Sequence, residues 1–425
     1  MEEATAAPGA QPRLRTDVLW TFGGKATTLL FGLLIVVAVA RELGPSGQGL
    51  FAVAYSLTLM LAQLGGLGLT AANPYFTARE PGQRASIVAN SLWLAAGLGV
   101  VLIAAGLALR AIAPDALEGL GWEPLLVTLA GVPGALAALF LQSVLLGESR
   151  MVAYNLIEAG HATVTLAALL VAFFAFDAGL TGALAVLTVG RYAAVVAYVA
   201  VLAPGRPDPQ LARRMLTYGL RAYVAIVVSF LVIRLDLLLV NGYLGSVEAG
   251  LYSVAATIAD GMFVLPMVVA LNLFPRVARS ESHEQSAEIF RSLAVLYGGL
   301  CLLTIPAAQA IPFVFGERFE ESIGLYYWLL PGVYCLGLLT ILAHHFAGRG
   351  YPKKAAGVWF VGLGVNVAIN VAFLPGRGAW VASLASSIAY AVLLALYVWL
   401  FVREAGSWST LRPRGGEIVR MVRGR

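Results

Sequence analysis

Apolar residues run through the chain in long blocks that short polar turns interrupt. A helix needs about 20 apolar residues to cross the hydrocarbon core of a bilayer. The connections between the blocks, such as GPSGQG, REPGQR, PGRPDP and PGRGAW, leave no room for a soluble domain. The pattern predicts an all-α polytopic membrane protein with twelve transmembrane helices. These span residues 16–41, 48–72, 85–110, 124–147, 153–176, 179–202, 216–241, 249–274, 289–314, 322–347, 355–374 and 379–402.

Composition excludes a water-soluble protein. Of the 425 residues, 60% are hydrophobic and 12% are charged, whereas a soluble domain carries about 25% charged residues. The net charge of +5 is typical of topology signals in a membrane protein, so nucleic acid is not an expected partner. Cys301 and Cys335 both lie in apolar runs. Neither a disulfide framework nor a metal site is expected, for want of clustered ligands.

The basic residues predict the orientation. With the N-terminus in the cytoplasm, twenty of the 28 Lys and Arg residues fall on the cytoplasmic side. Four fall on the other side, and four lie within spans. Because loops rich in Lys and Arg stay in the cytoplasm, we expect a multi-pass protein with both termini cytoplasmic. The basic tail is expected to attract anionic membrane lipids.

One stretch of the sequence occurs twice in similar form. LGPSGQGLFAVAYSL starts at Leu43, and LGSVEAGLYSVAATI starts 201 residues later, at Leu244. The same offset relates two further pairs, Pro74 with Pro275 and Gly147 with Gly348. Three separated matches at one offset indicate two copies of a six-helix unit. Because six is even, both copies insert in the same orientation, which gives a parallel repeat of the kind found in secondary transporters.

The repeat predicts five parts along the chain. They are a cytoplasmic N-terminus (1–15), an N-lobe (16–202), a cytoplasmic linker (203–215), a C-lobe (216–402) and a basic cytoplasmic tail (403–425). Two similar bundles can rock against each other and open a central site to one side of the membrane and then to the other. We therefore expect a transporter.

Ionisable residues within the spans are candidates for substrate contact, because each costs about 2.5–3.5 kcal/mol to insert. The basic ones are Lys25, Arg191, Arg221 and Arg234. Lys25 has no acid one helical turn away, so its charge is available for a ligand. Arg221 can instead snorkel to the surface. Arg234 can instead pair with Asp236 or Asp260 in a structural bridge. More bases than acids at this depth favour an anionic substrate, such as a phosphate-bearing lipid.

A second polar group lies in the last two spans. Asn366 and Asn370 stand four residues apart, so both amides project from one helical face. Ser386 lies near the start of the next span, and Asp236 is the only acid of the seventh. Amide and hydroxyl oxygens with one carboxylate suit a small hard cation such as sodium. The alternative is hydrogen bonding between helices without an ion.

No enzyme is predicted. The sequence contains no phosphate-binding loop, no histidine–cysteine metal spacing and no nucleophile elbow. His344 and His345 are neighbours near one membrane face, which indicates an interfacial position rather than catalysis. Sodium apart, no cofactor is expected.

Five stretches follow one another along the chain: ARELGPSGQGLFAVAYSL, ESRMVAYNLIE, YGLRAY, RLDLLLVNGYLGSVEAGLYSVA and NLFPRVARSE. Their ordered set resembles bacterial polysaccharide-unit flippases of the O-antigen and exopolysaccharide type. These belong to the multidrug/oligosaccharidyl-lipid/polysaccharide exporter superfamily. The resemblance runs from about residue 13 to residue 402.

This resemblance implies two six-helix lobes that form a V around a central cavity. It implies translocation of an undecaprenyl-diphosphate-linked oligosaccharide from the inner to the outer leaflet of the bacterial cytoplasmic membrane by alternating access. In the related lipid II flippases, basic cavity residues meet the diphosphate. Lys25 is similar to such a position, Arg221 and Arg234 match by region, and Arg191 completes the basic set. A polysaccharide polymerase or other envelope-assembly proteins are implied partners.

The related flippases also bind sodium between their seventh, eleventh and twelfth helices. Asp236, Asn366, Asn370 and Ser386 are similar to that site in helix and spacing. Asn370 stands where an aspartate would be expected, which lowers the negative charge of the site. The lipid II flippases have two further C-terminal helices that this sequence lacks, so an O-antigen, capsule or exopolysaccharide unit is expected rather than lipid II.

Two other functions stay open. A multidrug or small-cation exporter of the same fold, coupled to a cation, would favour acids over bases in its cavity, and Lys25 and Arg234 argue against it. A membrane scaffold without transport activity would recruit assembly enzymes through the basic tail. A ligase or polymerase is disfavoured, because no long periplasmic loop carries the chemistry.

Overall fold

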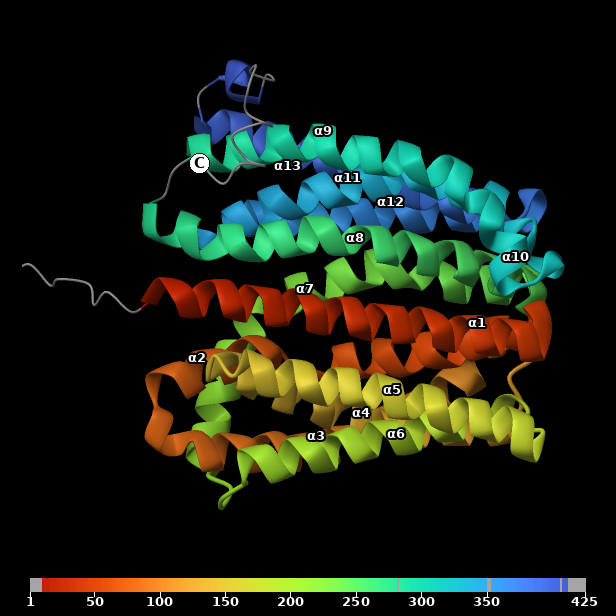
Figure 1. Ribbon diagram of the computed structural model, residues 1–425, viewed down its shortest axis with the longest axis horizontal. Coiled ribbons are helices and arrows are strands. Elements are labelled where there is room, and N and C mark those ends of the chain that lie inside the picture. Colours follow the sequence, from red (N-terminus) through yellow and green to blue (C-terminus); the bar gives the residue numbers. More distant parts are fainter. Residues whose placement is uncertain (1–9, 281–282, 350–352, 406, 412–425) are drawn as a thin grey trace, which may run out of the picture. The chain divides into compact units, whose positions relative to one another are not determined.

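The computed structural model describes residues 10–280, 283–349, 353–405 and 407–411. Within these ranges, side chains are described except at residues 10–26, 221–222, 268, 271–280, 348, 353 and 409. This part of the chain forms thirteen α-helices, joined by turns and short 3-10 segments, and contains no β-strand (Figure 1). The predicted all-α class is confirmed.

The helices follow the apolar blocks of the sequence. The first half of the chain contains α1 (Ala10–Gly65), α2 (Leu69–Arg79), α3 (Arg84–Ile112), α4 (Trp122–Gly147), α5 (Met151–Phe176) and α6 (Leu180–Leu202). The second half contains α7 (Pro209–Leu244), α8 (Ser246–Ser280), α9 (His283–Ala307), α10 (Ile311–Phe315), α11 (Ser322–Gly348), α12 (Lys353–Arg377) and α13 (Trp380–Ala405). Turns that contain Gly or Pro separate many of them, because these residues punctuate helices.

Among the described residues, eleven helical stretches are long and apolar enough to cross a membrane. Ten of them each overlap one predicted segment, and Thr27–Gly65 overlaps the first two. Its 39 residues extend about 58 Å as helix, nearly twice the roughly 30 Å thickness of a bilayer core. The backbone leaves helical geometry at Gly44, with φ 67° and ψ −174°, directly before Pro45. Two helices therefore meet at this kink, where the sequence predicts a turn.

Packing within the chain defines two compact units. The N-unit comprises residues up to Ala38, Leu57–Leu109 and Gly121–Val224, and the C-unit comprises Val39–Ser56, Arg110–Leu120 and the residues from Ala225 onward. Helices α1 and α7 contribute to both units. The predicted lobes at 16–202 and 216–402, with the linker between them, stay a prediction.

In the N-unit, α4 packs against α2, α5 and α6, and α5 packs against α6 (Figure 1). The buried amide of Asn73 in α2 connects three helices. Its Nδ2 atom donates to Oγ of Ser91 at 3.2 Å, to the carbonyl of Phe140 at 3.1 Å and to Oγ of Ser143 at 3.1 Å. The Nδ2 donor of this buried amide is thus satisfied by its neighbours, whereas its Oδ1 atom has no partner among the described residues.

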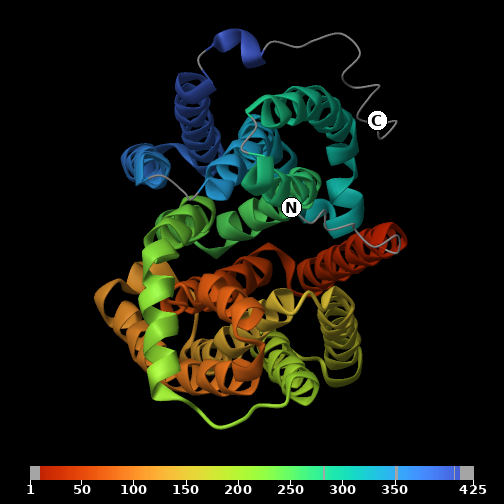
Figure 2. The ribbon, with the colours of Figure 1, turned by 90° about the vertical axis from the view of Figure 1, so that its left-hand side faces the viewer.

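In the C-unit, α11 is the central helix. It packs against α8, α9 and α13, and α12 packs against α13; Figure 2 views these helices along their length. Leu339, Leu342 and Phe346 of α11 share one hydrophobic cluster with Leu393 and Phe401 of α13. Ser322–Ala347 is the most buried of the candidate spans, as expected for a helix that others surround.

The two copies of the repeated stretch contact each other within the C-unit. A Cβ atom on Gly49 would lie 1.8 Å from the carbonyl oxygen of Ser246, and one on Gly250 would lie 1.9 Å from that of Pro45. Gly49 and Gly250 are equivalent at the 201-residue offset, and so are Pro45 and Ser246. The contact is therefore reciprocal, as an internal twofold relation requires. The hydroxyls of Ser46 and Ser246, 2.7 Å apart, add a hydrogen bond.

Candidate functional site

Arg234 of α7 forms an ion pair with Asp260 of α8. Its Nη2 atom lies 2.8 Å from Oδ2 of Asp260, and the two side chains are 31% and 42% exposed. The structure selects Asp260 from the two partners that the sequence left open, because residues two apart on a helix do not face each other. Within the described part of the chain, Nη1 and Nε of Arg234 make no hydrogen bond. These donors are available to an anion.

Asp236, half a turn further along α7, is buried and 3% exposed. Its Oδ1 atom accepts from the backbone N–H of Leu237 at 2.8 Å. Its Oδ2 atom accepts from Oγ of Ser386 at 2.8 Å and from the hydroxyl of Tyr252. Among the described residues, no Lys or Arg forms an ion pair with it. Burial of an unpaired carboxylate is costly, and a bound cation or a proton relieves the cost.

Ser386 of α13 connects Asp236 to two asparagines of α12. Nδ2 of Asn366 donates to Oγ of Ser386 at 3.1 Å, and Nδ2 of Asn370 donates to Oδ1 of Asn366 at 3.1 Å. All three side chains are fully buried. In the described structure, Oδ1 of Asn370 and Oγ of Ser383 have no hydrogen-bond partner. The polar chain thus ends in the buried Oδ1 atom of Asn370, which an additional ligand can satisfy.

The structure brings together all four residues that the sequence predicts for cation binding. With the tyrosine, they form what we call the Asp236 cluster: Asp236, Tyr252, Asn366, Asn370 and Ser386. Tyr252 is not among the residues predicted from the sequence, although the repeat contains a signal for it. The equivalent position of the first copy is Phe51, so the hydroxyl is present in the second copy alone.

The donor set of the Asp236 cluster fits a small hard cation. Its carboxylate, hydroxyl and amide groups offer oxygens, which hard cations prefer. One carboxylate balances one positive charge. The unpartnered oxygens of Asn370 and Ser383 would each cost about 1–3 kcal/mol if left unsatisfied. The residues that would hold sodium are Asp236, Asn366, Asn370 and Ser386, and sodium binding stays a prediction.

Arg191 lies on α6 of the N-unit, which packs against α5. Between these two helices, the hydroxyl of Tyr198 in α6 donates to Oε1 of Glu158 in α5 at 2.5 Å. His161 and Thr165 share a hydrogen bond of 3.3 Å. Arg191 itself makes no hydrogen bond or ion pair with the described part of the chain. Its guanidinium is therefore available to a ligand.

Two of the four basic residues predicted to bind the diphosphate fall outside the described side chains. These are Lys25 and Arg221, and their role stays a prediction. Of the two that are described, Arg191 belongs to the N-unit and Arg234 to the C-unit.

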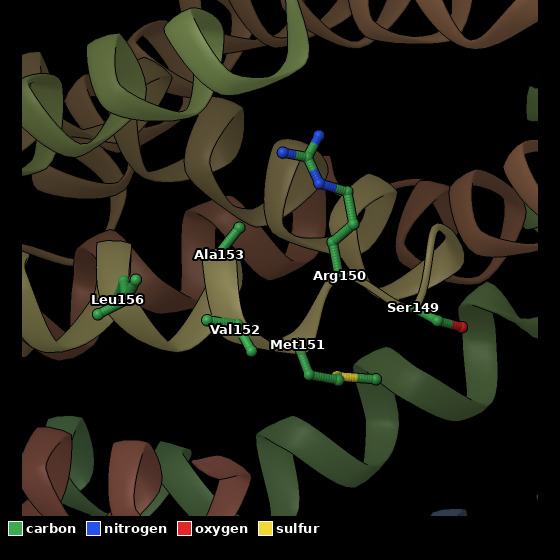
Figure 3. A pocket seen from close by; sticks show the side chains of 6 residues that line it. All are labelled: Ser149, Arg150, Met151, Val152, Ala153 and Leu156. Carbon is green, nitrogen blue, oxygen red and sulfur yellow. The ribbon is translucent and has the colours of Figure 1, made fainter. Parts of the chain in front are cut away.

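A surface pocket lies at the start of α5, apart from any predicted site residue. Its lining residues are Ser149, Arg150, Met151, Val152, Ala153 and Leu156 (Figure 3). Figure 3 shows the Arg150 side chain directed away from that of Met151. Nη1 of Arg150 lies 3.4 Å from Oε2 of Glu148 and 3.3 Å from the carbonyl of Val201. Because this charge is already engaged within the N-unit, the pocket is mainly apolar.

Comparison with known proteins gives a family. A family model described as polysaccharide biosynthesis protein matches residues 14–281. That is more than half of the chain. No curated protein sequence matches the chain.

Solved structures of membrane transporters share the fold. The lipid II flippase MurJ, in an inward closed conformation, superposes with a TM-score of 0.73 at 12% identity and covers 96% of each chain. An inward-facing multidrug resistance MATE family transporter gives a TM-score of 0.72 at 15% identity, over 89% of this chain and 95% of that one. A MOP superfamily transporter from Pyrococcus furiosus gives 0.56 at 15% identity, over 92% and 94%. At these identities, the likeness concerns the fold.

The fold and the family match agree with the resemblance found in the sequence. The apolar helices make the chain a multi-pass membrane protein, and its structural neighbours are transporters and flippases. With residues 14–281 matched, the chain belongs to the polysaccharide biosynthesis protein family.

Proposed function

We propose that the protein is a flippase for an undecaprenyl-diphosphate-linked oligosaccharide. It carries the lipid from the inner to the outer leaflet of the bacterial cytoplasmic membrane by alternating access. The family match over residues 14–281 is the observation that carries this proposal. The fold shared with a lipid II flippase over 96% of both chains supports it. The proposed cargo is an O-antigen, capsule or exopolysaccharide unit.

Arg234 is the described residue best suited to contact the diphosphate. Its Nη2 atom is held by Asp260, while Nη1 and Nε make no hydrogen bond with the described residues. A guanidinium donates in a planar fork that matches phosphate oxygens. Asp260 thus orients the fork and leaves donors for the substrate. Lys25, Arg191 and Arg221 are proposed for the same role from the sequence.

We propose that the Asp236 cluster couples transport to sodium. The cluster connects α7, α8, α12 and α13 through hydrogen bonds that end on one buried carboxylate. An ion bound there would alter the contacts of four helices at once. Occupancy of the cluster can therefore bias the C-unit toward one of two arrangements, if the ion binds them with different affinities.

A second candidate function is export of a small cationic molecule with cation coupling. The buried carboxylate of Asp236 and the fold shared with a multidrug resistance transporter favour it. Arg234 argues against it, because it neutralises Asp260 on the neighbouring helix α8. A positive charge there would repel a cationic substrate.

Reconstitution with two substrates separates these functions. Purified protein in liposomes is given a fluorescent undecaprenyl-diphosphate oligosaccharide or a fluorescent lipophilic cation, with sodium and proton gradients imposed in turn. The flippase predicts movement of the lipid between leaflets and no accumulation of the cation. Protein-free liposomes, and an undecaprenyl analogue that lacks the diphosphate, are the controls and should show no transfer. Cation transport without lipid transfer would establish the exporter instead.

We also propose that both termini face the cytoplasm and that a polysaccharide polymerase or another envelope-assembly protein is a partner. The excess of Lys and Arg on the side of the termini supports this orientation.

A further inference from the structure

Three residues that the transport proposal does not use meet where α9 begins and where α11 and α13 end. They are His283, His345 and Glu404, and one ligand atom from each lies within 4.8 Å of the other two. We propose that this histidine cluster binds a divalent transition-metal ion of the zinc type. The site lies wholly within the C-unit, and its occupancy does not depend on which substrate the protein carries.

His345 has the environment of a metal ligand. Its side chain is fully buried, its Nδ1 atom lies 2.7 Å from Oγ of Ser286, and its Nε2 atom has no partner among the described residues. Metal-binding histidines commonly hold one ring nitrogen in a hydrogen bond and offer the other to the ion. When Ser286 accepts from Nδ1, the lone pair of Nε2 is left for a metal.

His283 supplies the second imidazole. Its ring centroid lies 5.1 Å from that of His345, and its buried Nδ1 atom has no hydrogen-bond partner in the described structure. Phe401 lies against both rings, with centroids 5.7 Å and 5.0 Å away. Two unsatisfied imidazole nitrogens beside an aromatic shield are unfavourable without a ligand. A metal ion resolves this.

Glu404 supplies the charge, and its exposure allows movement. Its side chain is 38% exposed, and its Oε2 atom lies 3.8 Å from Nε of Arg349. Nη1 of Arg349 also lies 3.3 Å from Nε2 of His283. Arg349 thus places its positive charge beside two of the three ligand residues, His283 and Glu404, where it competes with a metal ion. Displacement of this guanidinium lets Glu404 rotate inward, which is needed because ligand atoms of tetrahedral zinc lie only about 3.3 Å apart.

The ligand set indicates the class of ion. Two neutral imidazoles and one carboxylate suit zinc, cobalt or iron(II). Calcium and magnesium ions are excluded as the preferred occupants because they favour oxygen donors over imidazole nitrogens. A bound ion would join the start of α9 to the ends of α11 and α13 in the C-unit. Helix α11 packs against both of the other two.

Metal titration of the full-length protein tests the site. The protein is purified in detergent without a polyhistidine tag, treated with a chelator and titrated with Zn²⁺ by calorimetry and with Co²⁺ by visible absorption. We expect one ion per chain and cobalt ligand-field bands. No saturable binding, or a thiolate charge-transfer band that assigns the ion to Cys301 or Cys335, would overturn the proposal.

Variants locate the ion. His345→Ala and His283→Ala should each weaken zinc affinity more than about 100-fold, and Glu404→Gln more than about tenfold, because loss of a residue that only supports a ligand already costs about 10–100-fold. Arg349→Gln should raise affinity severalfold, because a competing cation is removed. His344→Ala is the matched control, since its Nδ1 atom lies 2.9 Å from the carbonyl of Thr340 and it is not part of the cluster. If His345→Ala does not fold, the zinc affinity of Glu404→Gln still tests the site. Unchanged zinc affinity in Glu404→Gln, or equal losses of zinc affinity in His344→Ala and His345→Ala, would contradict the assignment.

Discussion

At Asp236, the chain buries a carboxylate within a membrane-spanning helix, where an ionised acid is costly. Hydrogen bonds from Tyr252, Ser386 and the backbone stabilise the charge but do not neutralise it. The residue equivalent to Asp236 in the first copy of the repeat is Ile35. The acid is therefore specific to the second copy, and it is not needed to build a six-helix unit. The proposed role in ion binding would account for its presence.

Replacement of Asp236 by Asn tests this role. We expect sodium to raise the melting temperature of the wild type, by an amount equivalent to about 2.7 kcal/mol at 100 times Kd. Asp236→Asn should abolish the effect, and Ser386→Ala should reduce it. Thermal unfolding in NaCl and in KCl of equal ionic strength measures the difference.

Ser229→Ala is the control for this series. Ser229 lies on the same helix, and its hydroxyl bonds to the carbonyl of Ile226, outside the Asp236 cluster. It should leave the sodium effect unchanged. Equal shifts in sodium and potassium, or a full sodium effect in Asp236→Asn, would remove the Asp236 cluster from the account.

The Arg234–Asp260 pair allows a separate test of anion binding. Loss of Arg234 removes charge-assisted hydrogen bonds, each worth about 1.5–3 kcal/mol, so Arg234→Gln should weaken binding of the diphosphate lipid at least tenfold. Asp260→Asn removes the competing acid and should tighten it severalfold. Because the pair is partly exposed, Asp260→Asn should reduce stability by only about 1 kcal/mol. Fluorescence titration of detergent-solubilised protein gives both affinities, and equal affinities would show that the pair is only structural.

At the scale of helices, the two copies of the repeated stretch approach each other closely within the C-unit. A Cβ atom on Gly49 or Gly250 would collide with backbone of the other copy, and backbone cannot rotate away. Glycine at both positions therefore allows two helix starts to approach closely, as small residues do in membrane bundles. The sequence shows the two glycines as equivalent, but only the structure shows that each packs on the other's copy.

Alanine substitution tests this contact. Gly49→Ala and Gly250→Ala should each reduce stability by about 1–3 kcal/mol through overpacking. Gly261→Ala in α8 is the matched control, because nothing lies within 4 Å of a Cβ there, and it should be neutral or mildly stabilising. Thermal unfolding in detergent measures all three. If Gly49→Ala were as stable as Gly261→Ala, the close packing of the two copies of the repeated stretch would be contradicted.

Most of the helices could be predicted from the sequence, because a long apolar block within a bilayer has few alternatives to a helix. The grouping of Asp236 with Asn366, Asn370 and Ser386 could be predicted from helical spacing and resemblance. The partner of Arg234 could not, because it depends on how α7 and α8 pack.

The histidine cluster could not be predicted from the sequence either. His283, His345 and Glu404 come from three helices far apart in the chain, so no local spacing indicates that they meet. The adjacent pair His344 and His345 predicts an interfacial position. In the structure the two rings have separate partners, Thr340 for one and Ser286 for the other. Consecutive residues on a helix point in different directions, which explains why neighbours in sequence have different surroundings.

At the scale of the whole molecule, three observations support the proposed flippase. They are an internal repeat, a fold shared with solved transporters and a match to the polysaccharide biosynthesis protein family. The sequence offers two halves of similar design with different chemistry. The buried acid and its tyrosine belong to the second half, and the basic candidates are shared between both. Such a division allows one half to respond to an ion while both contribute to moving a charged lipid.

Movement of a lipid-linked oligosaccharide between leaflets is the direct test of flippase activity. Wild type, Arg234→Gln and Arg206→Gln are reconstituted into liposomes with a fluorescent undecaprenyl-diphosphate oligosaccharide, and an external quencher reports the fraction in the outer leaflet. Arg206 lies exposed in the turn before α7 and serves as the matched loss of one positive charge. The account predicts rapid transfer by the wild type and by Arg206→Gln, and transfer at least tenfold slower with Arg234→Gln. No transfer by the wild type, or equal rates in all three proteins, would contradict it.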